Sequence, residues 1–116
     1  MCGLFLLQKN GGEGILEDRT VKIGYADYTI KKPLEIVQVG GEYYGIVDFD
    51  NHVIKIANKN KTHDKNKTFL HEVLHCICHR FSLQELNSNE QAIDLLATGI
   101  YEMLKDNPHM FIMEDI

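Results

Sequence analysis

The sequence predicts a small α+β domain, and three observations support this prediction. The chain has 116 residues, a length that suits one domain, 1–116, with one modest core. Up to about residue 57, β-branched and aromatic side chains alternate with polar ones, whereas after residue 64 apolar side chains recur at helical spacing. Hydrophobic residues make up 44% and charged residues 25% of the chain, which excludes a disordered tail, a fibrous repeat and a coiled coil.

The strands are expected in the first half of the chain. Residues 1–19 contain a glycine-rich stretch and are expected to form a loop or a frayed lead-in. Two turn signals, Gly40-Gly41 and Asp50-Asn51, separate the alternating segments that follow. The expected strands cover 21–23, 28–30, 35–39, 43–49 and 52–57. This pattern predicts a small antiparallel sheet.

Two helices are expected in the second half, after a polar and basic connection over 58–67. The first helix covers about 64–81 and the second about 88–106. Ser88 and Gln91 have the spacing of a capping box at the start of the second helix, and Asn107-Pro108 ends it. The sheet is expected to pack against the first helix, and the second helix to complete the core.

Charge and cysteine content limit the partners and the compartment. The formal net charge of −5 favours neither a nucleic acid nor an anionic membrane as a partner. Cys2, Cys76 and Cys78 make a poor disulfide framework, which favours a reducing compartment. The apolar run 4–7 is too short for a signal peptide or a membrane span. We therefore expect a cytoplasmic protein.

The motif that carries chemistry is His71-Glu72-Val73-Leu74-His75, an HExxH sequence. Residues four apart lie one turn apart on one face of a helix, so both imidazoles can reach a single ion. Glu72 lies close to that face, where it could take a proton from a water bound to the metal. The alternative is that one or both histidines merely satisfy local hydrogen bonds.

The pattern of apolar residues on the first helix agrees with a metal site. A stripe of apolar side chains is expected to face the core, and the two histidines and the glutamate fall on a separate polar arc. The stripe consists of Leu70, Val73, Leu74, Ile77 and Phe81. Cys76 and Cys78 point in different directions and cannot chelate one ion together, so we interpret both as small core or flank residues.

The second helix offers a third ligand. Glu90 and Asp94 are four residues apart, beside an apolar stripe formed by Ile93, Leu96, Ala97, Ile100, Met103 and Leu104. Two acidic side chains bordering such a stripe call for a positive group opposite them, and a metal with its histidines would be one. Glu90 would then be the third ligand, and Asp94 would hold the far ring nitrogen of a ligand histidine. The alternative is a solvated helix edge whose carboxylates are favoured by the helix dipole.

An HExxH helix followed by Glu-xxx-Asp on the next helix resembles the gluzincin metallopeptidases. The segment 68–108 looks like small metallopeptidase-like proteins of phages and prophages, which are grouped with the ImmA/IrrE-like metallopeptidases. The segment 45–56 is similar to the hairpin before the active-site helix in that group. The spacing from His75 to Glu90 is short, so the cleft would be minimal.

The resemblance implies a minimal zincin-like fold and a role for each matched residue. His71, His75 and Glu90 would bind Zn²⁺, Glu72 would be the general base, and Asp94 would support a ligand histidine. A sheet edge within 44–57 would accept an extended peptide by strand addition. For the residue that stabilises the oxyanion, Tyr101 is the candidate because it lies along the line of Glu90 and Asp94; alternatively it is a core tyrosine. His52 and His109 could also serve, but the spacing selects neither.

These features and the resemblance predict a zinc metallopeptidase. It would hydrolyse a peptide bond of a protein substrate by attack of a zinc-bound water from which Glu72 takes a proton. Its partner would be a protein or peptide such as a repressor or host factor. The alternative is a catalytically silent, zinc-stabilised protein-binding module of phage or prophage origin. A third hypothesis is a plain α+β domain in which the six histidines are incidental.

Overall fold

The computed structural model describes residues 18–110, and at residue 63 only the backbone. The expected lead-in over 1–19 therefore lies almost entirely outside the described residues. The elements confirm the α+β class, because six strands precede three helices in the part of the chain that is described. The strands are β1 (Arg19–Ile23), β2 (Ala26–Lys31), β3 (Ile36–Gln38), β4 (Gly41–Tyr43), β5 (Gly45–Asp48) and β6 (Val53–Ile56). The helices are α2 (Thr62–Arg80), α3 (Gln84–Asn87) and α4 (Glu90–Asp106).

The main sheet is mixed, so the prediction of an antiparallel sheet was wrong in one place. The strand order is β1-β2-β6-β5. β1 pairs with β2 and β5 pairs with β6 in antiparallel fashion, but β2 pairs with β6 in parallel. The 21 residues between β2 and β6 contain three other strands, and this is long enough for the crossover that parallel pairing needs. Side-chain alternation predicts a strand but not its direction, which explains the error.

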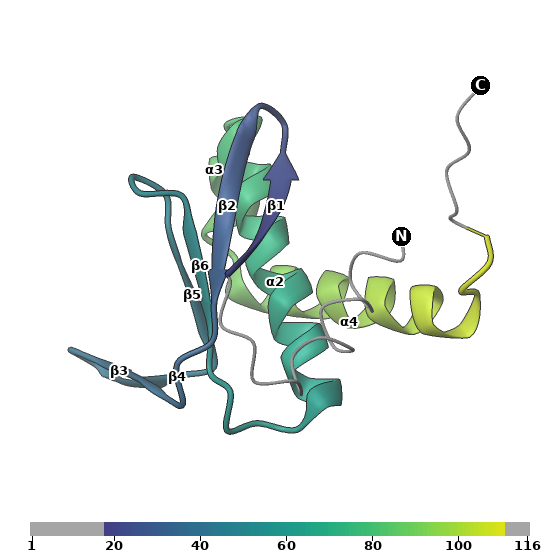
Figure 1. The fold of residues 1–116 in the computed structure, drawn as a ribbon. Coiled ribbons are helices and arrows are strands. Elements are labelled where there is room, and N and C mark those ends of the chain that lie inside the picture. The colour runs from purple at the N-terminus through teal and green to yellow at the C-terminus, as the bar shows by residue number, and fades with distance from the viewer. Residues whose placement is uncertain (1–17, 111–116) are drawn as a thin grey trace.

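Both predicted turns are confirmed, although only one of them joins two strands of the main sheet. At the β5–β6 turn the Asn51 N–H donates to Asp48 Oδ1 over 3.1 Å, and His52 adopts a φ of 54°. The Gly40-Gly41 signal joins β3 to β4, which form a separate two-stranded sheet. This β3–β4 hairpin projects from the body of the molecule (Figure 1). Lys59 of the β6–α2 connection forms ion pairs with Glu35 and Glu42 of the hairpin region.

Helix α2 is the centre of the fold because it packs on two sides. The sheet and both long helices are visible in Figure 1, with the helices on one side of the sheet. Towards the sheet, Phe69 and Cys76 join a cluster of buried side chains that includes Tyr28, Ile30, Ile54 and Ile56. Towards α4, Leu70 packs with Ala97 and Tyr101. This two-sided packing holds the start of α4 beside the middle of α2.

The helix boundaries agree with the sequence to within about two residues, but two details differ. The first residue of α4 is Glu90, and its cap is Asn89, whose Oδ1 accepts from the Ala92 N–H. Ser88 instead donates its hydroxyl to the Glu85 carbonyl, so the capping box predicted from Ser88 and Gln91 was wrong. The sequence analysis also missed the short helix α3. An asparagine at the cap position accepts a hydrogen bond from the same backbone N–H as a serine would, so the cap lies one residue later than predicted.

The apolar stripes are partly confirmed. Ile93, Ala97 and Leu104 of α4 are buried. Phe81 is 61% exposed. It follows the last residue of α2, so its backbone is no longer helical and its side chain does not continue the apolar stripe. Leu96 and Met103 are also exposed, at 46% and 43%. Among the described residues, no helix is long and apolar enough to cross a membrane.

Candidate metal centre

The centre forms where the middle of α2 meets the first turn of α4. His71 and His75 lie one turn apart on α2, and Glu90 opens α4. The Asn89 cap fixes the direction in which α4 starts and therefore where the Glu90 side chain begins. The packing of Leu70 against Ala97 and Tyr101 holds the two helices together beside this point.

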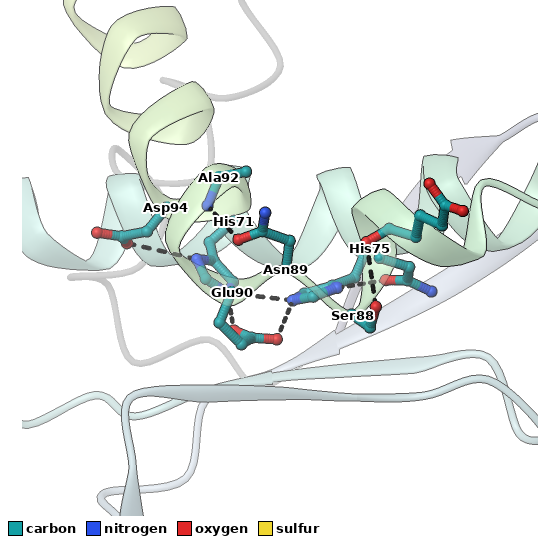
Figure 2. Close-up of polar contacts among 9 residues, drawn as sticks. His71, His75, Ser88, Asn89, Glu90, Ala92 and Asp94 are labelled. Atoms are coloured by element: carbon teal, nitrogen blue, oxygen red, sulfur yellow. Dashed lines mark hydrogen bonds and ion pairs between the residues drawn. The ribbon is translucent and has the colours of Figure 1, made fainter.

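The three predicted ligands converge (Figure 2). One carboxylate oxygen of Glu90 lies 2.9 Å from His71 Nε2 and the other lies 3.0 Å from His75 Nε2. The two Nε2 atoms are 3.1 Å apart. One donor atom from each residue lies within 4.8 Å of the other two, so this group could hold a metal ion. The histidine side chains are largely buried, at 16% and 12% exposed, whereas Glu90 is 69% exposed.

The far ring nitrogen of each histidine also has a partner. His71 Nδ1 lies 3.4 Å from Asp94 Oδ1, as the sequence analysis expected (Figure 2). His75 Nδ1 lies 2.5 Å from Asn87 Oδ1, a hydrogen bond in which the ring N–H donates to the amide oxygen. A proton on Nδ1 in each contact would leave Nε2 free to bind a metal ion in place of its present contacts.

Glu72 is buried and lies beside the two histidines. The residue is only 7% exposed. Burial raises the pKa of its carboxyl, His71 opposes this rise and Glu90 adds to it, and together they bring the pKa to about 7. The strand β5 crosses directly over this carboxyl. A Cβ added to Gly45 would come within 3.1 Å of Glu72 Oε2 and 2.7 Å of Thr68 Cγ2. The strand can approach the helix this closely only because residue 45 is a glycine.

Two hollows open on either side of this crossing, and both are lined by Gly45, His71 and Glu72. The first, of about 430 Å³, is here called the polar hollow. Its other lining residues are Tyr44, Asn60, Asp64, Lys67, Thr68 and Asp94. The second, of about 740 Å³, is here called the wide hollow. Apolar residues of the β5 region line one side of it, namely Ile46, Val47 and Phe49, and His75, Asn87 and Glu90 line the other.

The remaining candidates lie elsewhere. Tyr101 is 7% exposed and packs with Leu70 and Ala97, and it is not part of the lining of either hollow. The ring of His52 lies 5.1 Å from that of Tyr28 in the sheet cluster, and His109 is exposed beyond α4. Cys76 and Cys78 are buried free thiols, which agrees with their interpretation as small core residues.

The sequence analysis missed two residues of the centre. Asn87 belongs to the short helix α3, and its segment carries no spacing signal that relates it to His75. Gly45 lies 26 positions before His71 and was interpreted only as part of a strand. Both contacts depend on tertiary packing. A glycine that opens a strand just before an HExxH helix is the one signal that could have drawn attention to Gly45.

Comparison with known proteins gives no match: no family model, no curated protein sequence and no solved structure is significantly similar to this chain. The functional argument therefore depends on the geometry of the centre and on the chemistry of its residues.

Proposed function

We propose that this protein is a zinc-dependent peptidase that hydrolyses a peptide bond in an extended segment of a protein substrate. The observation that carries the proposal is the meeting of His71, His75 and Glu90 at one point, with the Glu72 carboxyl beside them between two open hollows. Three protein ligands that leave a further position open are typical of catalytic rather than structural zinc sites.

We propose zinc as the metal for this donor set. Two imidazoles and one carboxylate are the ligands of a familiar class of hydrolytic zinc sites, and magnesium and calcium prefer oxygen donors alone. The partners of the far ring nitrogens, Asp94 and Asn87, leave each Nε2 lone pair available for an ion. When bound, zinc would lower the pKa of a coordinated water towards 7 and polarise a substrate carbonyl.

Glu72 is the group that would move the proton. Its Oε2 faces Gly45 at the junction of the two hollows, so a water between the hollows would lie within its reach. Glu72 would take a proton from that water and later deliver it to the leaving amine. Its burial keeps bulk water away from the proton during this transfer.

The strand β5 would bind the substrate backbone. It is one of the two outer strands of the four-stranded sheet, and one of its edges has no strand paired with it among the described residues. Such an edge offers backbone N–H and C=O groups to an extended peptide, which would then pass over Glu72 at Gly45. The hollows on either side would receive side chains from the two sides of the scissile bond.

A second candidate function is a metal-stabilised protein-binding module. The observation that favours it is the β3–β4 hairpin, on which Val37 and Val39 are 68% and 101% exposed. Exposed aliphatic side chains on a projecting hairpin suit contact with a partner protein. On this proposal the metal holds α2 and α4 together and takes no part in a reaction.

Metal content and hydrolysis test the first proposal against the second. We expect one zinc per chain by elemental analysis, much less in Glu90→Ala, and no loss in Glu102→Ala, an exposed glutamate of the same helix. Glu72→Gln should keep the zinc and lose hydrolysis of an unfolded protein substrate. If wild type binds zinc but cleaves nothing, the binding module is favoured. If Glu72→Gln cleaves as well as wild type, the proposed base is wrong.

A further inference from the structure

The polar hollow has a lining that restricts what it can hold. It lies between the end of the β3–β4 hairpin, the β6–α2 connection and the first turns of α2. Its charges are mixed: Asp64 and Asp94 are carboxylates, whereas Lys67 is a cation. Thr68 adds a hydroxyl on the same side of α2. The hollow therefore offers both hydrogen-bond donors and acceptors next to the proposed catalytic groups.

Asn60 brings to this lining a buried amide donor that has no partner among the described residues. Its Nδ2 is buried and has no hydrogen bond to any described residue. A buried amide donor without an acceptor is costly, and a ligand that supplies the acceptor recovers that cost. The terminal amide torsion of asparagine is broad, so Nδ2 can turn towards a ligand in the hollow without a change of backbone.

We propose that the polar hollow is a specificity pocket that binds an asparagine or glutamine side chain of the substrate through Asn60. This inference rests on the proposed peptidase function. The amide oxygen of the substrate accepts from Asn60 and Lys67, and its NH₂ group donates to Asp64. A primary amide is the side chain that satisfies donors and acceptors together without adding a charge.

Other side chains fit this lining less well. A substrate carboxylate also accepts from Asn60 and Lys67, but it has no proton to donate to Asp64 and is repelled by the two carboxylates, Asp64 and Asp94. A lysine or arginine has no acceptor for Asn60 and lies beside Lys67. An apolar side chain offers no partner to Asn60, Asp64 or Lys67 and displaces the water around them.

The test uses blocked nonapeptides of alanine and serine that differ at one position, which carries Gln, Glu, Lys or Leu and is moved along the chain. Two quantities are measured: kcat/KM with the zinc-loaded protein, and binding by fluorescence anisotropy to the zinc-loaded Glu72→Gln variant. We expect Gln peptides to be favoured at least about fivefold over the others in both, which corresponds to the net contribution of one or two hydrogen bonds.

Asn60→Asp replaces the donor with an acceptor of the same shape. We expect this variant to prefer Lys peptides, because the hollow then carries three carboxylates. Asn66→Asp is the matched control: its Nδ2 is also buried without a described partner, but Asn66 does not line the hollow, so the Gln preference should persist. If Asn60→Asp does not fold, Asn60→Ala serves instead and should lose the preference without reversing it.

The outcomes separate this inference from the proposed function. Cleavage without a Gln preference, or a preference unchanged in the Asn60 variants, overturns the pocket and leaves the peptidase in place. Selective binding of Gln peptides without cleavage overturns the peptidase and supports the pocket. If the peptides are neither cleaved nor bound selectively, both proposals are wrong.

Discussion

Each candidate ligand histidine has a partner at its far ring nitrogen. His71 uses Asp94 of α4, whereas His75 uses Asn87 of α3. The helix holding Asn87 has only four residues, and the two neighbouring helices hold it in place. Without an acceptor at Nδ1, the His75 ring can rotate and can place its proton on the nitrogen that faces the metal. Loss of such a partner weakens metal binding, because the ring is then no longer held in the orientation and tautomer that the metal needs.

We predict that Asn87→Ala weakens zinc binding by about 10- to 100-fold. Asn87→Asp should restore most of the affinity, because it keeps an oxygen acceptor at the same place. Competition with a fluorescent zinc chelator measures the affinity of each variant. Asn58→Ala is the control, since Asn58 is an exposed asparagine that bonds to Lys65 away from the centre. Equal affinities for wild type and Asn87→Ala would contradict the role assigned to Asn87.

At the scale of the elements, the closest approach in the centre is that of β5 to α2. The two meet at Gly45, where a methyl group would overlap Thr68 Cγ2 at 2.7 Å and press on Glu72. Thr68 and Glu72 lie on a rigid helix whose other faces are packed, so neither can move away freely. The crossing therefore tolerates no side chain without a shift of the strand.

We predict that Gly45→Ala destabilises the fold by about 1–3 kcal/mol, the usual range for overpacking. It should also abolish hydrolysis, because the strand must move off the Glu72 carboxyl. Urea unfolding measures the first effect. The matched control is Gly99→Ala on α4, where an added Cβ meets nothing within 4 Å. Alanine there should stabilise the helix by about 0.5–1 kcal/mol. A Gly45→Ala protein with unchanged stability would contradict this account.

The elements also explain which parts of the fold and centre the sequence could predict. Local signals predicted both long helices, the two turns and the convergence of His71, His75 and Glu90, because helical spacing fixes where such side chains point. Strand direction depends on a crossover, and no local pattern reports it. For α2 we predicted a single apolar face, but the helix packs against both the sheet and α4. Phe69 and Cys76, which lie outside the predicted stripe, are therefore buried towards the sheet. Asn87 and Gly45 reach the centre only through packing between elements.

At the scale of the whole molecule, the core under the sheet contains a buried tyrosine. Tyr28 is 3% exposed and lies in the same buried cluster as Cys76. Burial, together with the neighbouring Cys76, raises the pKa of Tyr28 from 10.0 to about 12. In the unfolded chain this hydroxyl ionises near pH 10, whereas in the folded protein it stays protonated. The unfolded state therefore gains stability relative to the folded state as pH rises above 10.

We predict that ionisation of Tyr28 does not change the free energy of unfolding below pH 10. Between pH 10 and 12 it should lower the free energy of unfolding by up to about 1.4 kcal/mol per pH unit. Tyr28→Phe should remove this part of the decline. Urea unfolding of both proteins from pH 8 to 12 isolates it as a difference. Tyr44→Phe changes a tyrosine that is 68% exposed, and its free energy of unfolding should fall with pH as that of wild type does. Parallel curves for wild type and Tyr28→Phe would be the contrary result.

At the same scale, a bound metal would connect the helices α2 and α4. The three candidate ligands lie on the middle of α2 and at the start of α4, and among the described residues the buried cluster between these helices is formed by Leu70, Ala97 and Tyr101. A ligand that binds only the folded state stabilises it by about 2.7 kcal/mol at a concentration 100 times its Kd. We therefore predict that zinc at that excess raises the midpoint of thermal unfolding by on the order of 10 °C. Glu90→Ala should lose this shift and Glu102→Ala should keep it, because only the former removes a ligand. If calorimetry shows the same shift in both variants, zinc is stabilising the protein from another place, and the centre between α2 and α4 is not its site.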